Sequence, residues 1–389
     1  MGTSLVVRGR LRRTADPVQM EIAAGRIEAM RPPGTVGDAS GVGNPDCLIA
    51  EGFFDIQVNG FAGVDFNRPQ VTGEDLRRAT AAMWAHGVTQ FLPTIVTAPV
   101  ESLAATLRAI ARAREQDAAL RRAIAGIHLE GPFLAPEDGP RGAHPADSIR
   151  DPDWELFRRL QEAAQGLIRL VTLAPERPGA IGLIWQLRQA GIVVGIGHTS
   201  AAESDIIQAV EAGAQLSCHL GNGSHAMLPR HRNYIQKQLA TDALLASIIV
   251  DGHHLPGYVV KNTIRCKGLE RLILITDAMA AAAAPPGDYR LGDVLAQVGQ
   301  DGYVRLPGTP YLAGSALTMD RAVENVTRFA EVSLEEAIQL ATRQPRRLFP
   351  DLGAGLAPGA PANLVVLRTG PPLTVEATIV DGEVVYRRG

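Results

Sequence analysis

Several short apolar runs in this sequence end in side chains that can bind a metal ion or carry a proton. The run 124–127 leads to His128 and then to Glu130, directly before a Gly-Pro pair that interrupts a strand. Later apolar runs end in the same way at His198, His219 and Asp277. One polar residue at a strand end usually marks only where the chain reaches water. Because parallel strands joined by helices point their carboxyl ends to one side, four such endings predict a shared rim.

Three of these rim residues make a possible metal-ligand set. Glu130, His198 and His219 offer one carboxylate and two imidazoles, which suit a divalent transition metal. A catalytic zinc ion is typically held by three protein ligands and keeps a further position open for water. At this point a second interpretation is equally open, in which these are buried residues that only hydrogen-bond to one another.

The segments between these residues alternate between strand and helix patterns. Predicted strands cover residues 53–58, 88–92, 124–127, 168–173, 191–197, 214–218, 245–250 and 271–276, with predicted helices at 74–85, 100–122, 153–165, 180–189, 202–212, 235–240 and 256–265. Eight β-α steps predict an α/β fold, a TIM-like (β/α)8 barrel whose active site lies at the carboxyl rim. An open doubly wound sheet is the alternative, but its Gly-rich phosphate-binding fingerprint is missing after the first strand.

Both ends of the chain lack long helical patterns. Short β-like runs lie at 4–9 and 19–30, and others lie at 362–367 and 378–386 with an Asp-Gly turn. We therefore expect the two ends to form one small β-sandwich domain. The predicted division is 1–50 for its N-terminal part, 51–353 for the hydrolase barrel and 354–389 for its C-terminal part. Residues 285–310 are interpreted as an insertion after the eighth strand, followed by helices at 318–329 and 334–342.

Composition narrows the possible partners. The 389 residues are 46% hydrophobic and 20% charged, with a formal net charge of −3 and no basic stripe, so we expect neither nucleic acid nor a membrane as a partner. The apolar run near the N-terminus is too short for a signal peptide, which favours the cytoplasm. Cys47, Cys218 and Cys266 are scattered, so neither a disulfide framework nor a thiolate metal cluster is indicated. By strand alternation, Cys218 is expected to point away from the face that His219 presents.

The motifs resemble those of a known family along nearly the whole chain. The matching stretches, in chain order, are GFFDIQVNGFAGVDFN (52–67), HLEGPF (128–133), GHTSA (197–201), VDGHH (250–254), LITDAM (274–279), LAGSALTM (312–319) and GAGLAPGAPANLVVL (353–367). As a set they resemble the amidohydrolase superfamily and, within it, the N-acetylglucosamine-6-phosphate deacetylase family.

This resemblance implies roles for the rim residues. Glu130, His198 and His219 correspond to the metal ligands. Asp277 corresponds to the catalytic carboxylate, which takes a proton from the attacking water and returns it to the departing amine. His144, in RGAHPAD, has the family's position for polarising the amide carbonyl, although a loop histidine without a function is the alternative. His128 is expected to pack against Glu130 or support it.

The resemblance also indicates how many metal ions are bound. Many superfamily members carry a His-x-His pair on the first strand for a second metal, and here Gln57 and Asn59 stand at those positions. Some deacetylases with the same Gln and Asn use one metal, so we expect one divalent ion, with zinc as the expected metal. Gln57 and Asn59 are expected to be among the residues that bind substrate, and simple polar lining of the rim is the other interpretation.

The implied substrate is an N-acetylated amino sugar, with N-acetylglucosamine 6-phosphate as the leading candidate and acetate as a product. His254 corresponds to a substrate-binding histidine near the phosphate, and His253 beside it is expected to be structural. In the loop HLGNGSHAMLPRHRNYI, residues 223–225 are inserted relative to the family pattern. The residues expected to bind substrate in this loop are Asn222, Gly223 and, for the phosphate, Arg230 or Arg232 helped by His231.

Other functions remain open from the sequence. The loop cations can instead be solvated, and the insertion can favour an unphosphorylated or different N-acetyl amino sugar. Another alternative is an amidohydrolase that acts on a cyclic amide or deaminates a base, although deaminases usually retain His-x-His. A binding or scaffold barrel is disfavoured because all three ligands and Asp277 are present. The resemblance further suggests a homodimer.

Overall fold

The computed structural model describes residues 5–11, 17–32, 34, 41–309, 311–353 and 355–389. Ser4, the first residue of a predicted strand, and Pro310, the last residue of the predicted insertion, lie outside the described residues. Residue 354, at a predicted domain boundary, also lies outside them, and the division into domains stays a prediction. No helix in the described part of the chain combines the length and the apolar character needed to cross a membrane.

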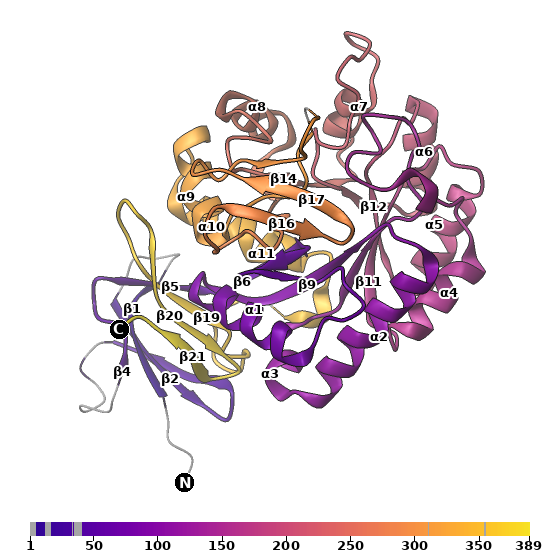
Figure 1. Cartoon of the computed structure of the whole chain (residues 1–389). Helices are drawn as coiled ribbons and strands as arrows, with labels where there is room; N and C mark the ends of the chain where they lie inside the picture. The colour runs from indigo at the N-terminus through magenta and orange to yellow at the C-terminus, as the bar shows by residue number, and fades with distance from the viewer. Residues whose placement is uncertain (1–4, 12–16, 33, 35–40, 310, 354) are drawn as a thin grey trace.

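Eight parallel strands form the central barrel, as the sequence predicted (Figure 1). In sheet order they are β6 (Phe53–Val58), β9 (Val88–Val96), β10 (Ile127–Glu130), β11 (Ile168–Leu173), β12 (Val193–Ile196), β13 (Leu216–Ser217), β14 (Leu245–Ile249) and β15 (Leu272–Ile275). The edges β15 and β6 meet where the amide of Asp277 donates to the Gln57 carbonyl over 2.9 Å. Their almost completely buried apolar side chains explain why each strand reads as a continuous hydrophobic run.

Helices surround the barrel on its outer side (Figure 1). They are α1 (Gly73–Ala85), α2 (Val100–Gln116), α3 (Ala118–Ala123), α4 (Trp154–Ala163), α5 (Ala180–Gln189), α6 (Glu203–Ala212), α7 (Tyr234–Ala240), α8 (Gly257–Lys267), α9 (Met319–Ala330), α10 (Leu334–Ala341) and α11 (Arg343–Arg346), with 3-10 turns at Ala146–Ser148, Leu269–Arg271 and Pro350–Leu352. The single helix predicted over 100–122 is wrong, because Asp117 interrupts it. The Asp117 carboxylate accepts hydrogen bonds from the amides of Ala119 and Leu120 and begins a new helix, α3.

Several strands next to the site differ in length from the prediction: the strand predicted at 88–92 extends to Val96, and the one predicted at 191–197 shortens to Val193–Ile196. The strand predicted at 124–127 begins only at Ile127, because Ile124 still caps α3, and His128 and Glu130 therefore lie inside β10. The strand predicted at 214–218 shortens to β13 (Leu216–Ser217). β10 and β13 still deliver their functional residues to the same rim, so the architecture is unchanged.

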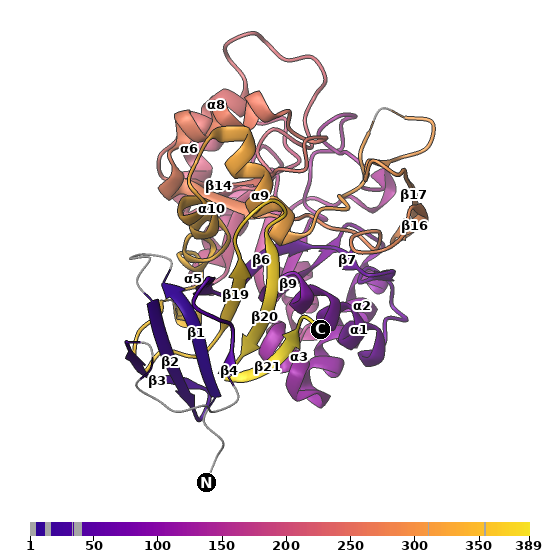
Figure 2. The ribbon, with the colours of Figure 1, turned by 90° about the vertical axis from the view of Figure 1, so that its left-hand side faces the viewer.

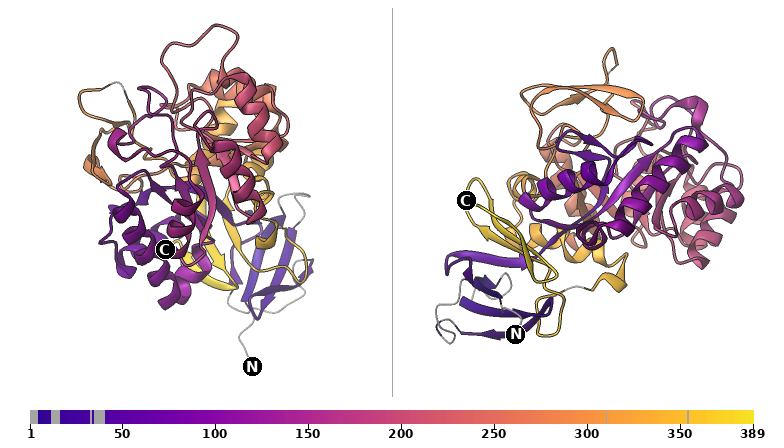
Figure 3. Two further views of the ribbon diagram at one scale, coloured as in Figure 1. Left: turned by 90° about the vertical axis from the view of Figure 1, so that its right-hand side faces the viewer. Right: turned by 60° about the horizontal axis from the view of Figure 1, so that its bottom comes forward.

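The insertion after the eighth strand contains a small antiparallel sheet that the sequence analysis missed. It consists of β16 (Gly287–Leu291), β17 (Val294–Val298) and β18 (Val304–Arg305). Leu291, Ala296 and Val298 are buried in a separate apolar cluster with Met279. The right-hand view of Figure 3 shows this orange sheet over the barrel. A hairpin, β7 (Gly60–Phe61) with β8 (Val64–Asp65), lies near it and is bonded to Ala280 and Ala282.

The two chain ends form one small β-domain, which confirms the prediction. Its strands are β1 (Leu5–Leu11), β2 (Pro17–Ala23), β3 (Arg26–Arg31), β4 (Gly41–Val42), β5 (Cys47–Glu51), β19 (Leu364–Arg368), β20 (Thr374–Val380) and β21 (Glu383–Arg387). In Figure 2, β1–β3 and β19–β21 appear as two differently tilted groups of strands. They enclose their own apolar core, which includes Val7, Met20 and Ile379. The Thr378 hydroxyl donates to the Trp84 carbonyl of α1 over 2.6 Å and ties this domain to the barrel.

Candidate metal and catalytic site

Four predicted site residues meet at the carboxyl rim of the barrel. Glu130 is the last residue of β10, and His198, His219 and Asp277 each follow a strand by two residues. These last three adopt left-handed backbone conformations, with φ of 50°, 28° and 48°. A non-glycine residue pays steric strain there, of order 1–3 kcal/mol each. Because these three strained positions surround one cavity, the strain is consistent with a function that requires these side-chain directions.

The three expected metal ligands lie within direct reach of one ion. Oε1 of Glu130 is 2.9 Å from His219 Nε2 and 3.3 Å from His198 Nε2. The two imidazole Nε2 atoms are 3.0 Å apart. Ligand atoms around a tetrahedral ion at about 2.1 Å are separated by roughly 3.4 Å, so the observed set is close to that size. The chemistry also fits, because a carboxylate oxygen and two imidazole nitrogens converge on one point.

Charge coupling inside this set is strong. Burial alone would raise the pKa of Glu130, but hydrogen bonds and charge from His198 and His219 hold it well below its usual range. Burial lowers the pKa of His219, yet the neighbouring Cys218 and Glu130 outweigh burial and hold it well above the usual range. These opposite shifts favour a proton between His219 and Glu130, and a cation that bound there would have to displace it.

His198 is oriented for ligation by its other ring nitrogen. Its Nδ1 is 2.8 Å from the Pro140 carbonyl oxygen, which can only accept, so Nδ1 carries the hydrogen. This fixes the tautomer and leaves the Nε2 lone pair directed at Glu130 and His219. Gly223 also packs against this ring, and a Cβ added there would lie 2.7 Å from His198 Nδ1. The inserted loop therefore needs a glycine at this position.

Asp277 lies on the same rim in the state expected of a proton carrier. The Asn59 amide donates to its Oδ1 over 2.7 Å. Burial, followed by the charge of Glu130, raises the pKa of Asp277 to about 6. A carboxyl group with a pKa near neutrality can both accept and return a proton.

His144 reaches the cluster from the loop after β10. Its Nε2 is 3.3 Å from His198 Nε2, and the ring is 7% exposed. Burial, together with the charge of His198, lowers the pKa of His144 to about 3, so the ring is neutral. Its Nδ1 is buried without a protein partner among the described residues. A neutral imidazole in this place can donate a hydrogen bond to a substrate oxygen.

The orientation predicted for Cys218 is wrong. Strand alternation placed it away from the site, but its Sγ lies 3.1 Å from Gln57 Oε1 and 4.0 Å from Glu130 Oε1. The reason is that β13 ends at Ser217, so Cys218 and His219 no longer alternate as strand residues, and His219 turns with positive φ. Glu130, Cys218 and His219 consequently bring ligand-type atoms within 4.8 Å of one another.

Gln57 hydrogen-bonds to Glu130, whereas His128 hydrogen-bonds to threonines of the two strands beside β10. Gln57 Nε2 donates to Glu130 Oε1 over 2.9 Å. His128 is fully buried, and burial lowers its pKa to about 4. We expected it to pack against or support Glu130, and its hydrogen-bonding partners are Thr172 at 2.8 Å and Thr94 at 3.4 Å. It therefore packs on the barrel interior between two neighbouring strands.

A cavity of about 290 Å³ opens above these residues. It is lined by the metal-ligand set and by His144, Asn59, Asp277, Asn222, Gly223, Ser224, His225 and His254. His254 is held by Asp251, with Nδ1 2.6 Å from Oδ2. His253 lies outside the cavity, and its Nε2 is 3.1 Å from the carbonyl oxygen of Asp301.

The inserted loop brings an unexpected residue to this cavity. His225 lines it, with the Tyr234 hydroxyl 3.0 Å from its Nδ1. Arg230 and Arg232 are exposed and do not line the cavity in this structure. The sequence offered only one signal for His225, which was the three-residue insertion itself.

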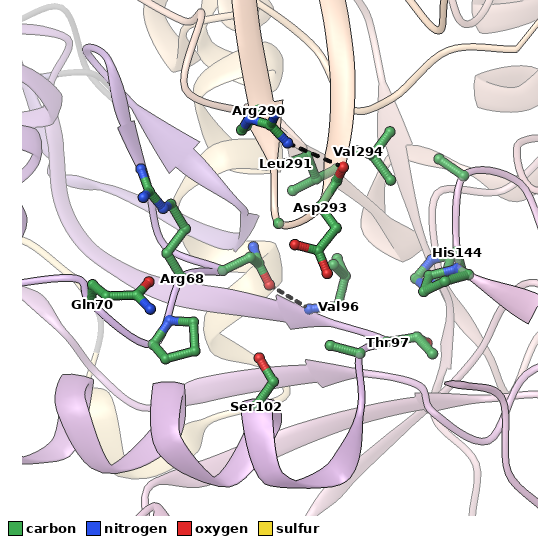
Figure 4. Close-up of a pocket in the computed structure, with 16 residues that line it drawn as sticks. Arg68, Gln70, Val96, Thr97, Ser102, His144, Arg290, Leu291, Asp293 and Val294 are labelled. Atoms are coloured by element: carbon green, nitrogen blue, oxygen red, sulfur yellow. Dashed lines mark hydrogen bonds between the residues drawn. The ribbon is translucent and has the colours of Figure 1, made fainter. Parts of the chain in front are cut away.

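A larger cavity of about 610 Å³ adjoins the first and shares Val96, Ala143, His144 and Leu291 with it. The β16–β17 hairpin forms one wall, and the carboxyl end of β9 with the start of α2 forms another. Figure 4 shows Ser102 and Asp293 pointing toward one another across this space. Sequence reasoning missed it because its walls come from loops distant in the chain.

The fold and site together define a (β/α)8 hydrolase barrel with a rim suited to a metal ion. The chain belongs to the amidohydrolase family, which it matches over residues 49–385. It is 33% identical to an N-acetylgalactosamine-6-phosphate deacetylase of Escherichia coli O157:H7, covering 95% of this chain and 94% of that protein. It is 35% identical to an N-acetylglucosamine-6-phosphate deacetylase of Danio rerio, covering 88% and 86%.

A solved structure is similar over the whole length. It is a variant N-acetyl-D-glucosamine-6-phosphate deacetylase of Mycobacterium smegmatis in complex with N-acetyl-D-glucosamine-6-phosphate. The TM-score is 0.89 at 33% identity, and the match covers 99% of this chain and all of the other. The resemblance inferred from the motifs is thus confirmed.

Proposed function

We propose that this protein hydrolyses the acetamide of an N-acetylated amino sugar, with N-acetylglucosamine 6-phosphate as the leading substrate. Water and the amide yield the amino sugar phosphate and acetate. The observation that carries this proposal is the meeting of Glu130, His198 and His219 with Asp277 in one cavity, in a chain similar to such deacetylases over its full length.

The residues divide the chemistry as follows. Glu130, His198 and His219 would hold a divalent ion, which would supply a lowered pKa for bound water and polarisation of the substrate carbonyl. Asp277 accepts a proton at the carboxyl oxygen that Asn59 leaves free, and later returns it to the amine nitrogen. His144, neutral at physiological pH, donates a hydrogen bond to the amide oxygen as negative charge develops there.

We propose that the site takes one zinc ion. Gln57 and Asn59 favour a single ion because their side chains already hydrogen-bond to Glu130 and Asp277. Metal analysis of protein loaded with excess zinc and then desalted is expected to give one tightly held ion per chain. Two tightly held ions at the rim would contradict the single-metal site.

For the sugar, we propose His254, Asn222 and Gly223 as contacts and Arg230 or Arg232 as the phosphate ligand, with His231 beside them. In that case the loop that carries Arg230 and Arg232 moves toward the cavity when substrate binds. The test compares kcat/KM for N-acetylglucosamine and its 6-phosphate in the wild type and in R230A and R232A. A phosphate preference of at least about a hundredfold, near 2.7 kcal/mol, is expected to collapse in one variant. Equal rates on both sugars in all three proteins would contradict this part.

The adjoining cavity favours a second candidate, a different N-acetyl amino sugar that carries a further polar substituent. Ser102 and Asp293 face that cavity and offer hydroxyl and carboxylate groups. The same assay, extended to the N-acetylgalactosamine 6-phosphate epimer and to N,N′-diacetylchitobiose, separates these candidates. We also propose a cytoplasmic homodimer, and light scattering of the purified protein tests the dimer.

A further inference from the structure

Three buried side chains form a hydrogen-bonded chain that ends on the candidate metal ligand Glu130. The Cys218 thiol lies 3.1 Å from Gln57 Oε1, and Gln57 Nε2 lies 2.9 Å from Glu130 Oε1. Each of the three residues is at most 3% exposed. The chain therefore runs from a thiol, through an amide, to a carboxylate, with almost no access for water.

The chemistry of an amide gives this chain a direction. Gln57 has one end that only accepts hydrogen bonds and one end that only donates them. An ionised Glu130 can only accept, so the donating Nε2 must face it. The accepting Oε1 then faces Cys218, which must supply a hydrogen. A neutral thiol does so, whereas a thiolate would repel the amide oxygen.

Cys218 also occupies a closely packed position. Its Cβ lies directly against Gly197, where an added Cβ would come within 2.9 Å of it, so the neighbouring strand end needs a glycine at position 197. Glu130 Oε1 at the same time contacts His219 at 2.9 Å. If the Gln57 amide rotated, its oxygen would face this carboxylate and push it out of line with the imidazoles.

We propose that Cys218 is a positioning residue that orients the Gln57 amide and, through it, the Glu130 carboxylate for a single metal ion. The inference rests on the metal site of the proposed function. The Gln57 NH2 group supplies partial positive charge to Oε1 of Glu130, the same oxygen that faces His198 and His219. A side chain that donates a hydrogen bond to Gln57 Oε1 is thus needed at position 218. Serine can replace cysteine, and alanine cannot.

The experiment compares C218A, C218S and the wild type for zinc affinity, measured by competition with a chelator of known affinity. We expect C218A to bind zinc 10- to 100-fold more weakly, as is typical for residues that support a ligand, and C218S to recover most of that loss. C47A is the matched control, because Cys47 is also buried but lies in the small β-domain. Its zinc affinity should equal that of the wild type.

A double-mutant cycle keeps the test independent of folding defects. Q57M removes the amide at similar volume, and adding C218A to Q57M should then weaken zinc binding no further. Equal affinities of C218A, C218S and wild type would overturn the proposal and leave Cys218 as a packing residue. The proposal would also be overturned if C218A lowered zinc affinity by the same factor in the wild type and in Q57M.

Cobalt substitution tests whether Cys218 instead binds the metal directly as a thiolate. If Cys218 were a thiolate ligand, the Co²⁺ protein would show an intense thiolate-to-cobalt charge-transfer band in the near ultraviolet that disappears in C218S. That result would overturn the donor role. We expect no such band in the wild type. Failure of the wild type itself to bind zinc or cobalt would instead contradict the proposed function.

Discussion

Two buried clusters of charged and polar residues at opposite ends of the barrel differ in how completely they are satisfied. At the amino end of β6, Arg346 is 6% exposed, donates to the carbonyls of Thr342 at 2.9 Å and Gly52 at 3.1 Å, and lies 5.5 Å from the centre of the Phe54 ring. Burial lowers its pKa only to about 10, so it stays charged. Both terminal nitrogens of this buried guanidinium thus have hydrogen-bond acceptors, as a buried charge in a stable core requires.

The carboxyl rim contrasts with this arrangement. Within the described residues, Asn59 Oδ1, His144 Nδ1 and His219 Nδ1 are buried without a partner. Three rim residues also have strained positive φ angles, and several imidazole nitrogens face one another. Burial of charge alone therefore does not mark a functional site in this protein. The combination of convergent ligand atoms, strain and unpaired polar atoms does, because such an arrangement is costly without a ligand.

The largest expected effect tests the rim. Asp277→Asn should lower kcat by more than about a thousandfold, near 4 kcal/mol of transition-state stabilisation, because an amide cannot carry the proton. Zinc content and stability should not fall, since Asp277 is not among the proposed ligands. Steady-state acetate release and metal analysis check both statements. A variant that kept about a tenth of the activity, a loss of roughly 1.4 kcal/mol, would show that Asp277 is not the essential base.

The opposite result is expected at the other end of the barrel. Arg346→Met should lower the free energy of unfolding by about 3 kcal/mol, because it leaves the buried Thr342 and Gly52 carbonyls unpaired, while kcat stays unchanged in the folded protein. Urea unfolding measures the loss. Arg343→Met, on the exposed side of the same short helix, is the control and should change stability little. A large fall in kcat for Arg346→Met with an unchanged free energy of unfolding would contradict the assignment of Arg346 to stability and not to catalysis.

A smaller, pH-dependent effect is expected at Asp55, which lies on β6 between the two clusters. Burial raises its pKa to about 7 despite a 2.5 Å hydrogen bond from the Thr276 hydroxyl. The folded protein then binds more protons than the unfolded chain between pH 4 and 7, so stability falls as pH rises through that window. In the wild type the free energy of unfolding should fall between pH 5 and pH 8, and Asp55→Asn should make that fall smaller by about 2 kcal/mol. Urea unfolding at both pH values measures this difference. An equal change in the free energy of unfolding between pH 5 and pH 8 in the wild type and in the variant would contradict the raised pKa of Asp55.

Local patterns were enough to predict the barrel and the residues gathered at its rim. Strand and helix periods show which segments pack inside, and parallel strands must present their carboxyl ends together, so Glu130, His198, His219 and Asp277 were expected to meet. Where local rules compete, the prediction failed. Asp117 interrupts a helix whose periodicity continues past it, and the short strands of the insertion are stabilised by packing against Met279 rather than by their own pattern.

The sequence by itself determined the order of elements and the chemical types available at the rim, because both follow from side-chain periodicity and residue identity. Only the tertiary structure decided which way Cys218 faces, because a single positive φ after a two-residue strand overrides alternation. It also decided that His225, and not Arg230 or Arg232, lines the cavity, since that depends on how the inserted loop packs on Tyr234. Side-chain direction in irregular segments depends on contacts between residues distant in the chain, which no local pattern encodes.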